Sequence, residues 1–404
     1  MTLAPPLDGP HDGPHEGPHE GPHEGPHEGP RNDQHDGQHG ERHGGQDEQD
    51  GQDAGRGRFR PAVLRSPLAR YLAARLLLVL PTVLLLLTAV FFLMRATGDP
   101  VTTAFADRLT PAQLQQKLHA AGYDRPLLTQ YLDYLRQVAT GDFGRTATDN
   151  RAVGEVLLTY GAATLELACW ALLVAVAVGV PLGALAARHR DRAPDAVLRL
   201  AAVLGYATPV FFVGLLLKLV FAVGLGWLPV AGRASVRTEL RLQDLSDPTG
   251  IYLLDALRSG DGAATADVLR HSVLPALALG LLLAGVLLRL VRTHLIATLD
   301  AEYVVAARSR GVGARRLLTR HAARPALVPV VTVLGLQVAG LLGGAVLTET
   351  TFEWKGLGYQ LAHYLTVRDF AAVQGIVALF AVVVAVVNFL VDALAALIDP
   401  RVRY

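Results

Sequence analysis

Residues 299–326 read LDAEYVVAARSRGVGARRLLTRHAARPA and form a basic, helix-prone segment between two long apolar runs. Eight arginines lie from Arg289 to Arg324, against two acids, Asp300 and Glu302. A membrane protein rarely carries so polar and so structured an insert without a partner that receives it. The apolar flanks and the basic insert together predict a membrane protein with one structured polar loop.

This segment predicts two short helices separated by glycine. Glu302 to Arg310 reads as one helix, and residues 314–323 read as a second. Gly311 and Gly313 permit a tight turn between them. Composition leaves two interpretations near even. In the first, the segment binds in a groove of a partner protein. In the second, it is only a loop whose arginines reflect the general enrichment of basic residues in cytoplasmic loops.

The composition of the whole chain supports the membrane assignment. The chain has 404 residues, of which 51% are hydrophobic and 18% charged, with a mean hydropathy of +0.32. These values are too apolar for a typical soluble protein and fit a polytopic membrane protein. The net charge of +1 says little about partners. The single cysteine, Cys169, excludes a disulfide within the chain and a cysteine-based metal site.

Six apolar runs are each long enough to cross a bilayer, which takes about 20 residues in a helix. They cover residues 72–94, 162–187, 197–222, 273–293, 327–350 and 372–398. Open backbone in lipid is prohibitive, so each run is predicted to be a helix. The first run is too long for a signal peptide and no small-residue cleavage site follows it, so we expect a retained anchor. The predicted fold class is an all-α polytopic membrane protein.

The distribution of arginine and lysine predicts the orientation of these spans, because cytoplasmic loops are enriched in both residues. The predicted inner segments hold 20 of them in 76 residues, and the outer segments hold 15 in 142. Both termini and the loop over residues 294–326 are therefore expected to be cytoplasmic. The long outer segment, residues 98–160, has apolar residues at helical spacing and a helix start at Thr110-Pro111, which predicts a small helical cap.

The first 57 residues have a different character. Residues 8–30 repeat glycine, proline, histidine and an acid, and eight of the fourteen histidines lie in this tail. Almost no apolar side chain is present, so the tail is predicted to be disordered. We favour a low-complexity extension over a weak metal-buffering tail. The candidate metal ligands of that second interpretation are His11, His15, His19, His23 and His27.

The sequence lacks the patterns of common catalytic sites. None of its three lysines, Lys117, Lys218 and Lys355, follows a glycine-rich phosphate loop, so we expect no ATP hydrolysis by that route. No nucleophile–base pair, HExxH motif or histidine cluster occurs outside the tail. The chain is therefore predicted not to be an enzyme, and no cofactor and no nucleic-acid partner are predicted.

Several polar residues lie inside the predicted spans and have two interpretations. They either line a pathway or make hydrogen bonds between helices, with snorkelling as a further alternative for Lys218. Proline and glycine within the spans are either hinges or packing sites. The candidates for a pathway or a hinge are Pro209, Gln337, Glu349 and Asn388, and the further polar positions are Glu166, Lys218 and Asp392.

The loop resembles the cytoplasmic "EAA" loop of bacterial ABC-importer permeases, most closely the dipeptide/oligopeptide/nickel branch. Two alanines, Ala306 and Ala307, are followed after three residues by Gly311 and preceded by Glu302-Tyr303. The glutamate of the wider superfamily falls on Val305, and Pro325 stands where the branch usually has another residue. Further similar stretches lie at residues 75–100, 124–127, 141–144, 224–229, 335–344, 349–350 and 399–401, so the resemblance covers about residues 68–404.

The resemblance implies a type I importer permease in a bacterial inner membrane. Such a permease pairs with a second permease subunit, and two ATP-binding subunits dock beneath them. The 299–326 loop would couple to one ATPase through Glu302, Tyr303, Ala306, Ala307 and Gly311. An extracytoplasmic solute-binding protein would deliver a di- or oligopeptide. The alternative substrate is nickel or another metal chelate, with the histidine-rich tail involved.

Overall fold

A computed structural model of the chain describes residues 67–96, 98, 102, 110–120 and 122–398, all within one compact unit. The predicted tail with its histidines, and the closing Asp399-Pro400-Arg401, lie outside the described residues. The described part is helical and contains no strand, which confirms the predicted all-α class. In chain order the elements are α1 (Pro67–Ala96), α3 (Pro111–Ala120), α4 (Leu127–Thr140), α5 (Val153–Arg188), α6 (Ala193–Ala207), α7 (Val210–Leu217), the π-helix η2 (Lys218–Gly224), α8 (Val236–Gln243), α9 (Tyr252–Arg258), α10 (Gly262–Leu299), α11 (Glu302–Ser309), α12 (Ala314–Arg316), the π-helix η3 (Leu317–Ala322), α13 (Ala323–Phe352), α14 (Leu357–Thr366) and α15 (Phe370–Ile398).

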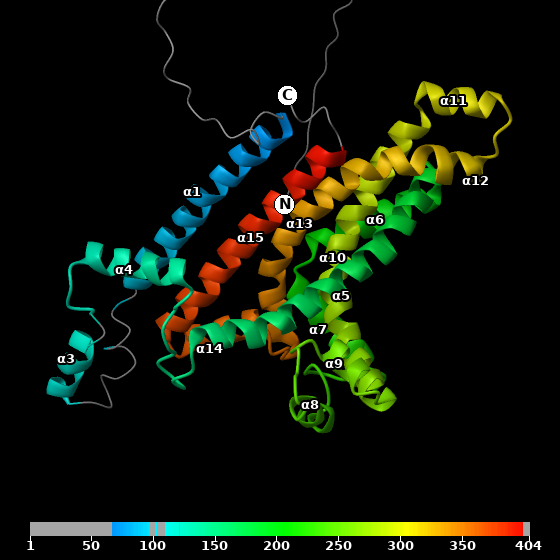
Figure 1. The fold of residues 1–404 in the computed structure, drawn as a ribbon. Helices are drawn as coiled ribbons and strands as arrows, with labels where there is room; N and C mark the ends of the chain where they lie inside the picture. The colour runs from blue at the N-terminus through cyan, green and yellow to red at the C-terminus, as the bar shows by residue number, and fades with distance from the viewer. Residues whose placement is uncertain (1–66, 97, 99–101, 103–109, 121, 399–404) are drawn as a thin grey trace, which may run out of the picture. The chain divides into compact units, whose positions relative to one another are not determined.

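Four helices, α1, α5, α10 and α15, are long and apolar enough to cross a membrane without a break (Figure 1). Two further spans are bent, so the described residues hold up to six. The third expected span is broken between α6 and α7–η2 by 106°, and the fifth bends by 54° between Gln337 and Gly340. Pro209 explains the first break, because Thr208 before it is extended, with φ −84° and ψ 130°.

The centre of the bundle is a seam between α5 and α10, where three glycines let the two backbones approach. A Cβ added at Gly179 would lie 2.8 Å from the carbonyl oxygen of Ala284, and one at Gly280 would lie 2.7 Å from that of Ala171. Gly183 is equally close to Leu288. Buried side chains fill the rest of the seam, notably Leu167, Leu279, Leu283, Leu287 and Val291. Small residues at such a seam allow close packing in lipid, where apolar side chains alone give little net attraction between helices.

The remaining long helices pack around this seam. The helix α13 packs on α10, while α1 and α15 pack against each other (Figure 1). The helices predicted within residues 98–160 are present as α3 and α4. Thr110 and Gln113 begin α3 as a capping box: the Gln113 side chain accepts from the Thr110 N–H at 3.1 Å, and the Gln113 N–H reaches the Thr110 hydroxyl at 3.5 Å. The helix α4 contacts α1 through Tyr131, whose hydroxyl is 2.6 Å from that of Thr88.

We predict that Gly280→Ala destabilises the protein by about 1–3 kcal/mol, because the new methyl group meets backbone and the side chain of Val174. The measurement is thermal unfolding of the purified chain in lipid nanodiscs, followed by tryptophan fluorescence. Gly343→Ala is the control, since nothing lies within 4 Å of its Cβ position. An unchanged midpoint for Gly280→Ala would contradict the close seam.

Candidate coupling surface

The helix α11 follows α10 after a connection of only two residues, Asp300 and Ala301. It ends at Ser309, and Gly311, two residues further on, has a φ of 82°, in the left-handed region that favours glycine. The Gly311 N–H donates to the carbonyl oxygen of Arg308 at 3.0 Å, and the Val312 N–H donates to that of Ala307 at 3.3 Å. The expected tight turn is therefore present at Gly311.

Two expectations for the loop were wrong in detail. Gly313 has a φ of −63° and precedes α12 in an extended conformation, so it does not need the freedom of glycine. Residues 314–323 do not form a separate second helix either. They run through α12 and η3 directly into α13, so the segment is the beginning of the fifth long helix. The loop is thus a single short helix, α11, held between the ends of two long ones.

The two faces of α11 differ. Val304 and Ala307 are buried and pack on Leu317, with Leu299 and Val312 beside them. The opposite face carries Glu302, Tyr303, Val305 and Ala306, all of them exposed. Hence α11 is anchored through one face and presents the other outward. We call this outward face, residues 302, 303, 305 and 306, the coupling surface.

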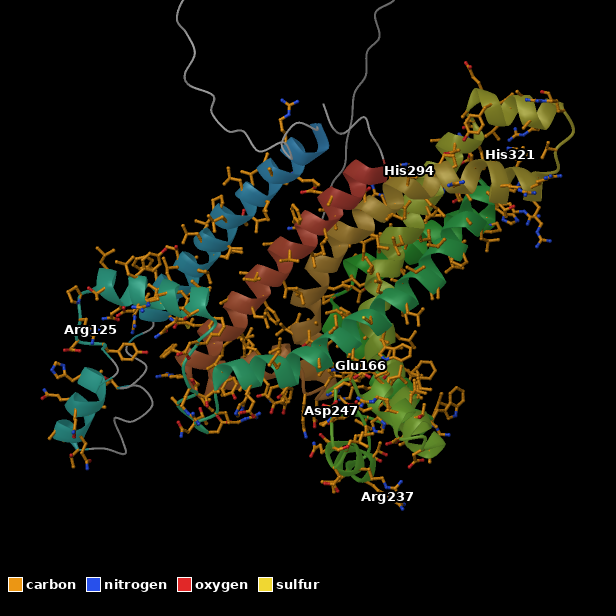
Figure 2. All side chains as sticks on the ribbon, in the orientation of Figure 1. Arg125, Glu166, Arg237, Asp247, His294 and His321 are labelled. Atoms are coloured by element: carbon orange, nitrogen blue, oxygen red, sulfur yellow. The ribbon has the colours of Figure 1, made fainter. Side chains whose placement is uncertain are left out.

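Four of the five residues expected to couple to the ATPase lie in exposed positions on α11 or in the turn after it. Glu302, Tyr303 and Ala306 belong to the coupling surface, and Gly311 forms the exposed turn after it. Ala307 faces inward, so it supports the helix and is not available for contact. The Tyr303 hydroxyl also donates to the carbonyl oxygen of His321 at 3.3 Å. His321 lies at the same end of the bundle (Figure 2).

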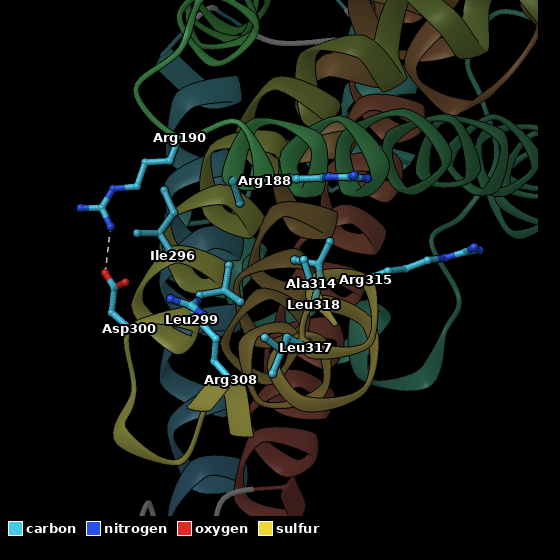
Figure 3. A pocket seen from close by; sticks show the side chains of 11 residues that line it. Arg188, Arg190, Ile296, Leu299, Asp300, Arg308, Ala314, Arg315, Leu317 and Leu318 are labelled. Atoms are coloured by element: carbon cyan, nitrogen blue, oxygen red, sulfur yellow. Dashed lines mark hydrogen bonds and ion pairs between the residues drawn. The ribbon is translucent and has the colours of Figure 1, made fainter. Parts of the chain in front are cut away.

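A cavity of about 330 Å³ lies beside the anchored face of α11 (Figure 3). Leu299, Leu317 and Leu318 give it apolar walls, and four arginines surround it. One of them, Arg190, forms an exposed ion pair with Asp300 at 2.8 Å. The other three are Arg188, Arg308 and Arg315. This end of the bundle is therefore positively charged and complementary to an acidic partner surface.

The helix α10 runs from this end of the bundle to the opposite end. It has 38 residues, or roughly 57 Å at 1.5 Å per residue. Near its α11 end, Arg292 donates to the buried carboxylate of Asp195 at 2.5 and 2.7 Å and so holds the start of α6 on α10. The two residues are 97 positions apart, and sequence reasoning did not pair them. The acid at the start of a helix was the only local signal.

A second buried ion pair lies at the α9 end. Arg233 donates to Glu166 of α5 at 2.5 Å, and both side chains are buried. Glu166 also accepts from the N–H of Leu253 at 2.8 Å, and the guanidinium lies 3.7 Å from the ring centre of Tyr252. Glu166 therefore fastens the loop around α9 to α5. Sequence reasoning singled out Glu166 but missed Arg233 as its partner (Figure 2 labels Glu166).

The four pathway or hinge candidates lie on three parts of the chain: Pro209 precedes α7, Gln337 and Glu349 belong to α13, and Asn388 belongs to α15. Glu349 is fully buried, accepts from Thr164 at 2.7 Å and from the Tyr359 N–H at 2.9 Å, and so fixes the start of α14. Pro209 is exposed at the break between α6 and α7. Gln337 and Asn388 are half-buried on α13 and α15.

Other polar positions in the spans have partners. Lys218 donates to the carbonyl oxygen of Thr351 at 2.8 Å, and Asp392 pairs with Arg75 at 3.3 Å. These contacts favour the interpretation in which polar residues join helices. Within the described residues, no group of three or more histidine, cysteine or acidic side chains could hold a metal ion.

Two family models match the chain. Residues 179–404 match the binding-protein-dependent transport system inner membrane component, and residues 68–155 match the N-terminal region of such membrane components. The di/tripeptide transport system permease protein DppB of Pseudomonas aeruginosa is 40% identical over 83% of this chain and 98% of its own length.

Further relatives have similar coverage. The dipeptide transport system permease protein DppB of Escherichia coli K12 is 38% identical over 83% of this chain and 99% of its own length. The glutathione transport system permease protein GsiC of Salmonella choleraesuis is 34% identical over the same shares. The matched regions begin after the histidine-rich tail.

We predict that Arg292→Met destabilises the protein by about 3 kcal/mol, because it leaves the buried carboxylate of Asp195 without its closest partner. Arg190→Met is the matched control. It breaks an exposed ion pair with Asp300, and such pairs contribute less than about 1 kcal/mol. Thermal unfolding in nanodiscs compares the two variants. Equal midpoints for both would show that the buried pair does not hold α6 on α10.

Proposed function

Since the chain belongs to the family of binding-protein-dependent transport system inner membrane components, we propose that it is the permease subunit of an ABC importer for di- or oligopeptides. The observation that carries the proposal is the geometry of α11. It is anchored on the ends of α10 and α13 and exposes Glu302, Tyr303 and Ala306. When a partner displaces a short helix held in this way, the displacement is transmitted to two membrane-spanning helices.

In this proposal the coupling surface seats in a cleft of a cytoplasmic ATP-binding subunit. A second permease subunit forms the other half of the pathway, and two ATP-binding subunits serve the pair. Closure of those subunits around ATP displaces α11. The displacement shifts the bundle between inward-open and outward-open states, because ATP binding favours one of the two. The partner subunits hydrolyse ATP, and this chain supplies α11 and half of the translocation pathway.

The proposal also fixes an orientation in the bacterial inner membrane. The α11 end, with its arginines, faces the cytoplasm together with both termini, in keeping with the excess of arginine and lysine in those segments. The opposite end, with α3, α4, α8 and α9, faces outward and receives the solute-binding protein. Pro209 is proposed as a hinge, because it lies at the sharpest break among the bent spans.

Peptides are the proposed substrates because of the relatives. Those reported above are named for di- and tripeptides, dipeptides and glutathione, and this chain spans nearly their whole length. The nickel or metal-chelate alternative depended mainly on the histidines of the tail, and the matched regions do not include that tail. The peptide proposal is therefore favoured over the metal proposal.

We predict that Ala306→Trp lowers dipeptide uptake at least about tenfold while leaving expression and the thermal midpoint unchanged, because the side chain is exposed and its bulk meets only the partner. Uptake of labelled dipeptide into proteoliposomes holding the complete importer is the measurement, with co-purification of the ATP-binding subunits. Ala74→Trp, exposed on α1 and not at the end that receives the solute-binding protein, is the control. Normal uptake by Ala306→Trp would remove the coupling role of α11.

We predict that deletion of residues 1–57 leaves dipeptide uptake unchanged, because the match to the family models begins at residue 68 and the dipeptide permeases align over nearly their whole length with 83% of this chain. The same proteoliposome assay is run with labelled dipeptide and with nickel. If the deletion abolishes a nickel uptake that the full chain supports, the metal alternative is the better account of function.

A further inference from the structure

A second cavity, of about 330 Å³, lies at the other end of the molecule, away from the coupling surface. It is bounded by the end of α1, by α4 and by the start of α15. Polar side chains dominate its lining, including Arg95, Gln130, Tyr134 and Gln374. Arg125, labelled in Figure 2, lies at its rim. Neither the coupling mechanism nor the spans explain why this cavity is polar.

Unpartnered buried groups are concentrated here. The described residues contain four buried side-chain nitrogen or oxygen atoms without a hydrogen-bond partner. Three of the four belong to residues lining this one cavity: Nε of Arg95, Oε1 of Gln130 and the hydroxyl of Tyr134. Gln130 is 9% exposed and Tyr134 is 6% exposed. Because buried polar groups are almost always satisfied, their gathering in one cavity points to a ligand that satisfies them.

The orientation of the Gln130 amide is fixed by its own contacts. Its Nε2 donates to the carbonyl oxygens of Tyr123, at 3.0 Å, and Arg125, at 2.7 Å. The flipped amide would place Oε1 against those two carbonyl oxygens, which is repulsive. Oε1 is therefore left as a hydrogen-bond acceptor and calls for a donor from the ligand.

The other two groups act as donors. Burial raises the pKa of Tyr134 to about 12, so its hydroxyl stays protonated at neutral pH. The Tyr134 ring stacks on Phe91 with the ring centres 5.7 Å apart, which holds the hydroxyl in place. The Arg95 guanidinium lies 5.3 Å from the ring centre of Phe91 and 4.2 Å from that of Tyr123. These contacts use the faces of the rings and leave the Nε–H free to donate.

We propose that this cavity binds the carboxylate end of a short peptide. The carboxylate accepts from Arg95 Nε and from the Tyr134 hydroxyl, and the last peptide N–H donates to Gln130 Oε1. The positive rim formed by Arg125 and Arg136 favours the negative charge of such an end, although Asp133, 3.5 Å from Arg125, offsets part of it. The volume lies at the lower end of the range for small-molecule sites.

The choice of a peptide, among compounds with a carboxylate and a neighbouring N–H, rests on the proposed function. In the proposed orientation the cavity is extracytoplasmic. It would hold a peptide on the permease itself, at the outer ends of α1 and α15, before the peptide enters the pathway. The site is distinct from the coupling surface, so loss of one leaves the other intact.

The test is direct binding to the purified full chain in phosphatidylcholine nanodiscs, measured by saturation-transfer difference NMR titration. The probes are alanyl-alanine and its C-terminal amide. We expect alanyl-alanine to bind, and the amide to bind at least about tenfold more weakly, because it lacks the charge that the arginine recognises. Equal affinity for acid and amide, or no binding of alanyl-alanine, would overturn the proposal, the second by showing that water alone satisfies the cavity.

Two conservative variants locate the site. Tyr134→Phe keeps the stacked ring and loses only the hydroxyl, and we expect about five- to tenfold weaker binding of alanyl-alanine. Arg95→Lys keeps the charge over the rings and loses the Nε donor, with a similar effect expected. Arg237→Gln on α8, exposed and remote from the cavity (Figure 2), is the control and should bind like the wild type. Unchanged binding by both Tyr134→Phe and Arg95→Lys would exclude this cavity.

The binding assay separates this inference from the proposed function. It uses the isolated chain and needs no ATP-binding subunit and no transport. Peptide binding that is sensitive to Tyr134→Phe, in a chain whose assembled importer moves no peptide, would count against the proposed function and leave the site standing. Peptide uptake by an importer whose permease shows no such binding would overturn the site and leave the proposed function standing.

Discussion

The seam between α5 and α10 is the constraint on which the rest of the structure depends. At Gly179, Gly183 and Gly280 the backbone of one helix lies so close to the other that no side chain fits between them. Two helices in such contact cannot slide or tilt independently without opening voids, and packed interiors resist that. Any force applied to the end of α10 is therefore delivered to both helices together.

Two ion pairs, each with a buried carboxylate, extend this rigid pair to its surroundings. Asp195–Arg292 fastens α6 near the α11 end, and Glu166–Arg233 fastens the loop around α9 at the other. Buried ion pairs contribute little net stability, because desolvation offsets most of the attraction. These pairs instead fix the relative position of the two elements that they join, because separating the partners would leave an unpaired charge in the interior at a high free-energy cost. The break at Pro209 lies between α6, which the first pair holds on α10, and α7, which neither pair contacts.

Local signals in the sequence predicted the local features of the structure. Hydrophobic runs located the long helices, Thr110-Pro111 located the start of α3, and Gly311 located the turn after α11. The features that sequence reasoning missed are those made by distant residues. Arg292 and Asp195 are 97 positions apart, and Glu349 reaches Thr164 across 185. Nothing near Glu349 in the chain distinguishes a carboxylate that fixes the start of α14 from one that lines a pathway.

The merging of residues 314–323 into α13 changes how the loop acts. A separate second helix would leave flexible joints on both sides of α11. Instead, α11 is joined to α10 by two residues and, through one turn at Gly311, to α12, which continues through η3 into α13. Val304 and Ala307 pack on Leu317 of η3. A displacement of α11 therefore moves the ends of two long helices at once. In the proposed mechanism that displacement turns the central helices as a group, because α10 is locked to α5 and α13 packs on α10. The helix α15 packs on α13 and α5 as well as on α1. The proposed coupling thus depends on the short, packed connections between α11 and the seam.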